Sequence, residues 1–354
     1  MTSTGAIRLE PRAWGGACPE VSRLSAIPVS ILDLAPIRAD GDAGSALRAS
    51  LDLARCAEEL GYTRFWVAEH HNMDGIASSA PAVLIAHLAA GTTRLRLGAG
   101  GVMLPNHPPL VVAEQFGTLD ALHPGRIDLG LGRAPGTDPL TARALRRDRP
   151  GGVEDFPAEV AQVRRLLGPA QAGQSLQAIP GTNSGVALWL LGSSLYSAQL
   201  AAALGLPYAF ASHFAPHHLE EALALYRRNF QPSSALAQPY AMAGVPLIAA
   251  PTDAEAEYLA TSLQQRALAL LRGQSLRLRP PVADLEAFWS AGERAAVQGL
   301  LGLAAIGGRE PVCAHLENLL ARIEVDELMF TCDIHDQSLR RRALALLMRW
   351  RADA

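Results

Sequence analysis

Two strand patterns separated by one helical pattern constrain the fold of this 354-residue chain more than any other feature. Residues 94–99 and 126–131 each run into a glycine-rich, polar end, and residues 109–122 have helical spacing between them. A crossover of that length predicts a parallel pair in a right-handed βαβ unit. Because ligands bind beyond the carboxyl ends of parallel strands, the pair Gly100-Gly101 and Arg133 are expected to line a binding site.

The alternation of strand and helix patterns continues along the chain. It predicts an α/β fold, a (β/α)8 TIM barrel, with a helical insertion at about 251–306 before the last βα unit. Residues 1–26 are expected to be a flexible N-terminal extension, and residues 27–354 a single domain. The eight expected strands are residues 27–34, 63–68, 94–99, 126–131, 187–191, 208–211, 240–250 and 327–331.

Composition argues against several classes of function. The net charge is -3 and no basic stripe is interleaved with aromatic residues, so nucleic acid is not an expected partner. The chain has no lysine, which excludes a catalytic or P-loop lysine. No apolar run has the length of a signal peptide or a membrane span. The four cysteines are scattered and fit no zinc spacing, which favours a cytoplasmic protein without a metal.

Histidines follow two of the expected strands. Glu69-His70-His71 comes at the carboxyl end of the second strand, where one histidine of the pair should face a pocket and the other the helix layer. Histidine suits acid–base chemistry near neutral pH, although a structural, hydrogen-bonded histidine is an open alternative. His213, after the sixth strand, is a candidate to line the same pocket. Its spacing to His217 and His218 lacks a third placed ligand, so a metal is not expected there.

A phosphate site is suggested by Gly192-Ser193-Ser194, which opens a helix after the fifth strand. Free N–H groups and the positive end of the helix dipole suit an anion there, and Arg133 comes from the same face of the barrel. Plain capping by serine and a surface role for Arg133 remain open. Gly100-Gly101 is either a simple turn or a place where backbone lies against an aromatic ring.

Together, these segments resemble the bacterial luciferase-like flavin-dependent monooxygenases, in their single-polypeptide subgroup. The resemblance covers residues 27–250 most strongly. The segments that carry it are 31–36, 66–71, 97–105, 130–133 and 192–207, with His107-Pro108, Glu114 and Gly125-Arg126.

The resemblance implies FMN at the carboxyl-end face of the barrel. It makes His70 the catalytic residue and places a peptide, often non-prolyl cis, at Gly100-Gly101 beneath the isoalloxazine. Gly132 stands where luciferase has a reactive cysteine, so no thiol acts there. The implied cofactor-binding residues are Ala99, Gly100, Gly101, Glu114, Arg133, Ser193, Ser194, Ser197 and His213, and the implied substrate-binding residues are Leu34, His71 and His107.

The implied reaction begins with reduced FMN delivered by a separate flavin reductase. The reduced flavin and O2 form a C4a-(hydro)peroxyflavin that oxygenates a small organic substrate, as in the secondary metabolism of bacteria. The resemblance also implies a homodimer. Two alternatives stay open: a relative that uses deazaflavin F420 for hydride transfer, and a non-catalytic flavin-binding barrel.

Overall fold

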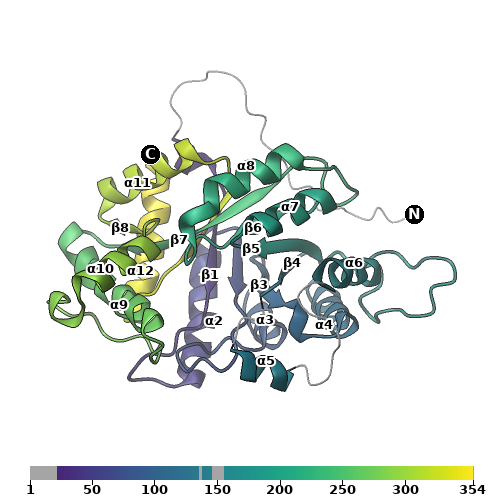
Figure 1. The fold of residues 1–354 in the computed structure, drawn as a ribbon, viewed down its shortest axis with the longest axis horizontal. Coiled ribbons are helices and arrows are strands. Elements are labelled where there is room, and N and C mark those ends of the chain that lie inside the picture. Colours follow the sequence, from purple (N-terminus) through teal and green to yellow (C-terminus); the bar gives the residue numbers. More distant parts are fainter. Residues whose placement is uncertain (1–21, 135–137, 146–154, 354) are drawn as a thin grey trace.

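A closed barrel of eight parallel strands forms the centre of the protein (Figure 1), which confirms the expected (β/α)8 fold. The structure, a computed structural model, describes residues 22–134, 138–145 and 155–353. Strands β1 to β7 pair in sequence order, and β9 closes the barrel between β7 and β1. β8 pairs with β7 outside the barrel. The strands are β1 (Val29–Asp33), β2 (Arg64–Val67), β3 (Arg96–Met103), β4 (Ile127–Gly132), β5 (Ala187–Gly192), β6 (Tyr208–Phe210), β7 (Ala241–Ala249), β8 (Ala305–Gly307) and β9 (Glu327–Thr331).

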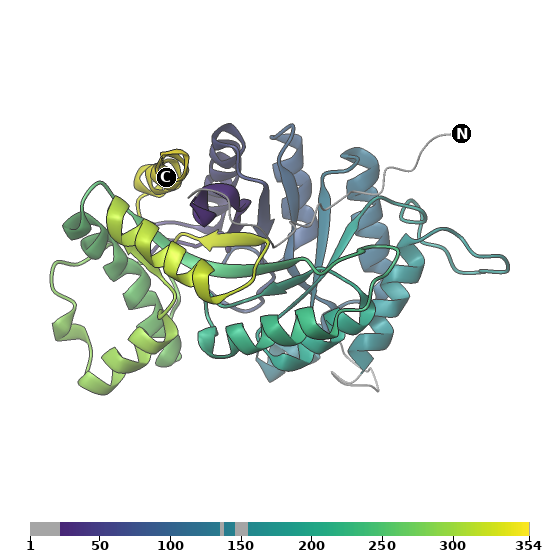
Figure 2. The same ribbon diagram turned by 90° about the horizontal axis from the view of Figure 1, so that it is seen from above.

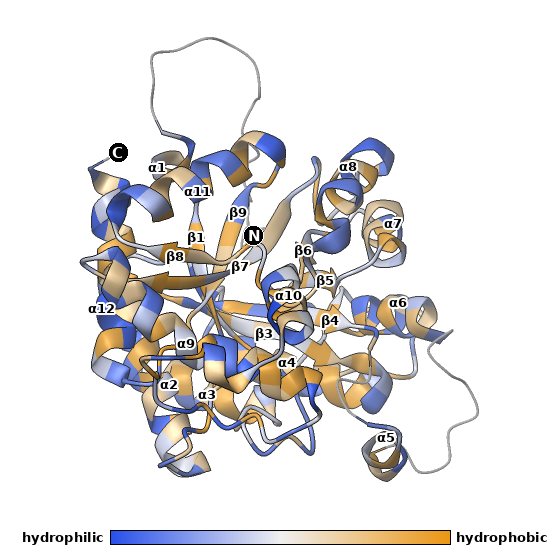
Figure 3. Ribbon diagram, turned by 60° about the vertical axis from the view of Figure 1, so that its left-hand side comes forward, coloured by the Kyte–Doolittle hydropathy of each residue, from blue (hydrophilic) through white to orange (hydrophobic). Residues whose placement is uncertain are grey.

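Helices surround the barrel and turn their apolar sides toward the sheet (Figure 3). Local sequence sets their ends: Asp42 and Ser45 cap each other at the start of α2, and Gly61 ends that helix in a left-handed conformation. The helices are α1 (Arg23–Ala26), α2 (Ala43–Leu60), α3 (Pro81–Ala90), α4 (Pro109–Leu122), α5 (Pro139–Leu145), α6 (Phe156–Leu167), α7 (Leu195–Leu204), α8 (Leu219–Asn229), α9 (Asp253–Leu271), α10 (Ala291–Leu300), α11 (Arg309–Arg322) and α12 (Gln337–Ala352).

A buried ionic network fills the N-terminal end of the barrel. Arg64 of β2 lies 2.9 Å from Asp128 of β4 and 2.9 Å from Glu327 of β9. The indole of Trp66 donates a hydrogen bond to Asp128, and the Tyr240 hydroxyl donates one to Glu327. Charges this deep are tolerated because each has a partner of opposite sign. The carboxyl end of the barrel is thus the end that is left for a ligand.

Two segments differ from expectation. Residues 22–26, expected within a flexible extension, include the helical turn α1, whose Leu24 is fully buried and donates its backbone N–H to Glu317 of α11. Residues 1–21 lie outside the described part of the chain. The second segment follows β4, where the strand patterns predict no element but the structure forms α5, which begins where Asp138 accepts from the backbone N–H groups of Leu140 and Thr141. Residues that cap a short helix, such as Asp and Thr, are also common in loops, so the sequence alone does not distinguish the two.

The expected insertion is present as a pair of helices, α9 and α10, on one side of the barrel (Figure 2). Between them the chain returns to the barrel as an extended strap, residues 274–278. Leu278 exchanges backbone hydrogen bonds with residues 37 and 39, after β1, and Leu276 donates its N–H to Asp74, after β2. A Cβ on Gly75 would lie 2.1 Å from the Leu276 carbonyl, so the strap touches bare backbone there. The insertion therefore borders the carboxyl end of the barrel.

Within the described residues, no helix has both the length and the apolar character needed to cross a membrane.

Candidate active site at the carboxyl end of the barrel

His70 extends the inward-facing row of β2 to the rim of the barrel. Side chains alternate along a strand, and those of Arg64 and Trp66 point into the barrel, with Ala68 in the same interior cluster as Trp66. His70 is next in that row and is half-buried, and its backbone N–H donates to the Ser78 carbonyl at 3.0 Å. Continued past the end of β2 at Val67, this alternation favours His70 as the histidine of the pair that faces inward, and its place in a pocket stays a prediction.

His213 comes from the opposite part of the barrel, after β6. Its Nδ1 atom is buried and has no hydrogen-bond partner among the described residues. A Cβ on Gly244 of β7 would lie 2.6 Å from this atom, so a glycine is needed there. Burial lowers the pKa of His213 to about 4. The charge of Asp333 opposes this shift, and the electrostatic effect of His70 adds to it. Because His70 follows β2 and His213 follows β6, both histidines lie at the carboxyl end of the barrel.

Glycines form one wall of this barrel end, on β3 and β4. The Gly100–Gly101 peptide bond is cis, as the resemblance implied, and the pairing of β3 with β4 shifts register between Gly100 and Val102. A Cβ on Gly100 would lie 2.8 Å from the Trp66 ring, and one on Gly101 would lie 2.7 Å from the Gly130 carbonyl. The aromatic ring that the structure places against this backbone is Trp66, which the sequence analysis did not single out.

The residues expected to bind a phosphate, Arg133 and the start of α7, lie next to each other. The Arg133 guanidinium lies over the Tyr196 ring, 4.2 Å from its centroid. Ser194 is the N-cap residue of α7 but makes no side-chain cap, and Ser193 precedes it, half-buried. Arg133 and the free N–H groups of this turn could hold an anion.

Ser197 faces inward from the first turn of α7. Its hydroxyl donates to the Ser194 carbonyl at 2.7 Å and lies 3.0 Å from the Tyr208 hydroxyl. A Cβ on Gly192 would strike it at 2.2 Å. Ser197 thus holds the turn to β6, and its role as a phosphate ligand stays a prediction.

The remaining expected residues occupy different surroundings. Leu34 is partly buried against the interior cluster that contains Trp66 and Trp189. Ala99 is fully buried in the core between sheet and helices, so its backbone is the part directed to the barrel. Glu114 is half-buried in the second turn of α4, in the helix layer. Their binding roles stay predictions.

Glu69 joins two histidines that are far apart in sequence. Its carboxylate accepts hydrogen bonds from the Met103 backbone at 3.0 Å, His71 Nε2 at 2.8 Å and His107 Nε2 at 2.7 Å. Burial disfavours its charge, but the bonds from His107, His71 and Met103 outweigh burial and lower the pKa of the Glu69 carboxyl. The sequence analysis missed this trio because His107 is 38 residues away; adjacency of the second and third strands was the available signal.

The sequence matches the family of luciferase-like monooxygenases over residues 27–326. The chain belongs to this family. A luciferase-like monooxygenase of Escherichia coli (strain K12) is 51% identical over 322 residues, which cover 91% of this chain and 96% of the relative. Membership in the family supports a monooxygenase, an oxidoreductase that uses O2, as the general activity.

Solved structures of other proteins share the fold. Apo-MsnO8 has a TM-score of 0.82 and 36% identity, and the match covers 92% of this chain and 98% of that one. The oxygenating constituent of 3,6-diketocamphane monooxygenase of Pseudomonas putida, solved in complex with FMN, has a TM-score of 0.70. That match covers 91% of this chain and 97% of the other at 15% identity, so it shows the fold alone.

Proposed function

We propose that this luciferase-like monooxygenase uses reduced FMN and O2 to oxygenate a small organic substrate. One observation carries the proposal: the cis Gly100–Gly101 peptide, the Arg133–Tyr196 pair with the start of α7, and His70 with His213 all belong to the carboxyl end of one barrel. In this proposal the peptide contacts a flat ring, Arg133 and the start of α7 bind a phosphate, and a histidine transfers a proton.

The donor set fits FMN at each of its ends. Arg133 supplies a positive charge for the phosphate, with backbone N–H groups at Ser193 and Ser194. Glycine at both positions lets this backbone pack directly on Trp66 and on the Gly130 carbonyl, and the bare Gly100–Gly101 peptide is the proposed support for the ring. Bound reduced FMN supplies the electrons that activate O2.

The protein's own groups position protons and limit water. His70 is the proposed base or proton donor, because it follows β2 at the carboxyl end of the barrel and histidine suits acid–base chemistry. His213 stays neutral near pH 7 and can offer or accept one hydrogen bond. Leu34 and Leu191, packed on the interior cluster, give the rim an apolar lining that suits an organic substrate.

The test follows the fate of oxygen. The wild type is supplied with reduced FMN, 18O2 and a panel of small ketones, thioethers and alkenes, and products are analysed by mass spectrometry. We expect one 18O atom in a product, and we expect His70→Ala to bind FMN like the wild type and lose at least about 100-fold in product formation. Equal product formation by His70→Ala would refute the role of His70.

Other outcomes would replace the proposal. If the wild type turns all O2 into hydrogen peroxide with every compound, a flavin-binding barrel without oxygenase activity is the better description. If reduced F420 binds and FMN does not, hydride transfer takes its place. The separate flavin reductase, the homodimer and the cytoplasmic location stay predictions from sequence and resemblance.

A further inference from the structure

We propose that Glu69, His71 and His107 form a binding site for a divalent transition-metal ion of the zinc class at the rim of the barrel. The donor atoms of the three side chains lie within 4.8 Å of one another. They come from two neighbouring loops: Glu69 and His71 follow β2, and His107 precedes α4. Its two histidines are also those that the resemblance implied for substrate binding, so the ion site is tested without substrate and without flavin.

The donor set is one that zinc uses in proteins. Two imidazoles and one carboxylate make a three-ligand site whose fourth position is taken by water or another small ligand. The Met103 backbone N–H donates to the second oxygen of Glu69, which leaves Oε1 directed at the histidines. Orientation of a ligating carboxylate by an outer hydrogen bond is a common feature of metal sites.

Exposure differs among the three ligands in a way that suits metal entry. The Glu69 side chain is fully buried, whereas the His71 and His107 side chains are 15% and 29% exposed. The ion would therefore enter from the side of the histidines, and the open coordination position would face solvent. A charge of +2 beside the buried carboxylate would also offset the cost of its burial.

Without the ion, both histidines hydrogen-bond to the same carboxylate oxygen. On binding, Nε2 of each imidazole would coordinate the ion with a proton carried on Nδ1, and the ion would take the place of the two hydrogen bonds. The ion would then tie the loop after β2 to the loop before α4.

The test uses untagged, full-length protein that has been treated with a chelator and carries no flavin. Zn2+ is titrated by calorimetry, and Co2+ by visible absorption. We expect one ion per chain, Co2+ bands of four- or five-coordinate geometry, and a rise in the thermal midpoint with Zn2+. His107→Ala should weaken binding at least about 100-fold, more than the loss of an outer hydrogen bond costs a metal site.

Two further variants complete the design. His71→Ala should weaken binding like His107→Ala, with circular dichroism to show that both variants are folded. His217→Ala removes an exposed histidine outside the trio and should bind like the wild type. Wild-type binding no tighter than that of His107→Ala would overturn the proposal and leave a hydrogen-bonded trio. FMN titration of the same samples tests the flavin site separately.

Discussion

His213 has a partly buried imidazole whose Nδ1 atom is fully buried, and this environment lowers its pKa. Its pKa is about 4 in the folded protein, below the ordinary value of 6.5 expected after unfolding. Between these pH values the unfolded chain binds a proton that the folded chain does not. The free energy of unfolding should therefore fall as pH is lowered from about 6.5 to 4, by on the order of 2–3 kcal/mol from this group.

The measurement is urea unfolding at pH 7 and pH 4.5. We expect His213→Gln to lose less stability than the wild type over this interval, because it has no titrating group. His218→Gln, at an exposed histidine, should keep the wild-type difference. Equal losses in the wild type and His213→Gln would show that His213 titrates normally in the folded state.

Strand periodicity in the sequence could predict which face of a strand a single side chain lies on. The inward position of His70 follows from alternation along one strand. The Glu69–His107 contact and the effect of Asp333 on His213 join different βα units, so they depend on barrel register that spacing does not reveal. Trp66 packing against Gly100 was missed for the same reason.

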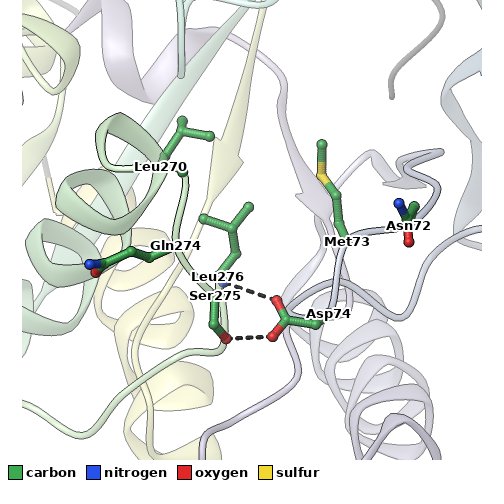
Figure 4. Close-up of a pocket in the computed structure, with 8 residues that line it drawn as sticks. Asn72, Met73, Asp74, Leu270, Gln274, Ser275 and Leu276 are labelled. Atoms are coloured by element: carbon green, nitrogen blue, oxygen red, sulfur yellow. Dashed lines mark hydrogen bonds between the residues drawn. The ribbon is translucent and has the colours of Figure 1, made fainter. Parts of the chain in front are cut away.

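The strap at residues 274–278 is a contact between two elements far apart in sequence. Asp74 accepts hydrogen bonds from the Ser275 hydroxyl and the Leu276 N–H beside an open pocket of about 390 Å³ (Figure 4). Asp74→Ala should free this segment locally at a cost of about 1–2 kcal/mol. Amide exchange of Leu276 and Leu278 should then be about 5- to 30-fold faster.

The matched control is Asp284→Ala in the same insertion. Asp284 accepts from the Glu286 N–H, outside residues 274–278, so exchange at Leu276 should stay as in the wild type. No difference between Asp74→Ala and Asp284→Ala would mean that backbone pairing at Leu278 holds the strap by itself. Sequence predicted the insertion, but its return across the loops after β1 and β2 depends on long-range pairing.

The buried network around Arg64 joins three strands across the whole barrel. Arg64→Met would leave Asp128 and Glu327 buried without their shared partner, although Arg96 still pairs with Asp128. The expected loss is about 3–5 kcal/mol in the free energy of unfolding, measured in urea. Arg294→Met breaks an exposed pair with Glu286 and should cost less than about 1 kcal/mol. Similar losses in both variants would contradict a stabilising role for the network.

The overall architecture was predictable because eight strand patterns alternate with helices and each has its own turn signals. Residues 22–26 and β8 were missed, since short segments gain their structure from what they pack against. The closed barrel, rather than any local motif, brings the ends of β2, β3, β4 and β6 together.

Flavin titration of the purified protein tests the central claim most directly. We predict that each chain binds one FMN, in its oxidised or its reduced form. Binding is measured by calorimetry or by flavin fluorescence. Arg133→Ala should bind about 10- to 100-fold more weakly, because it loses charge-assisted hydrogen bonds to the phosphate. Absence of binding for both forms of FMN, or equal affinity in Arg133→Ala, would contradict this assignment.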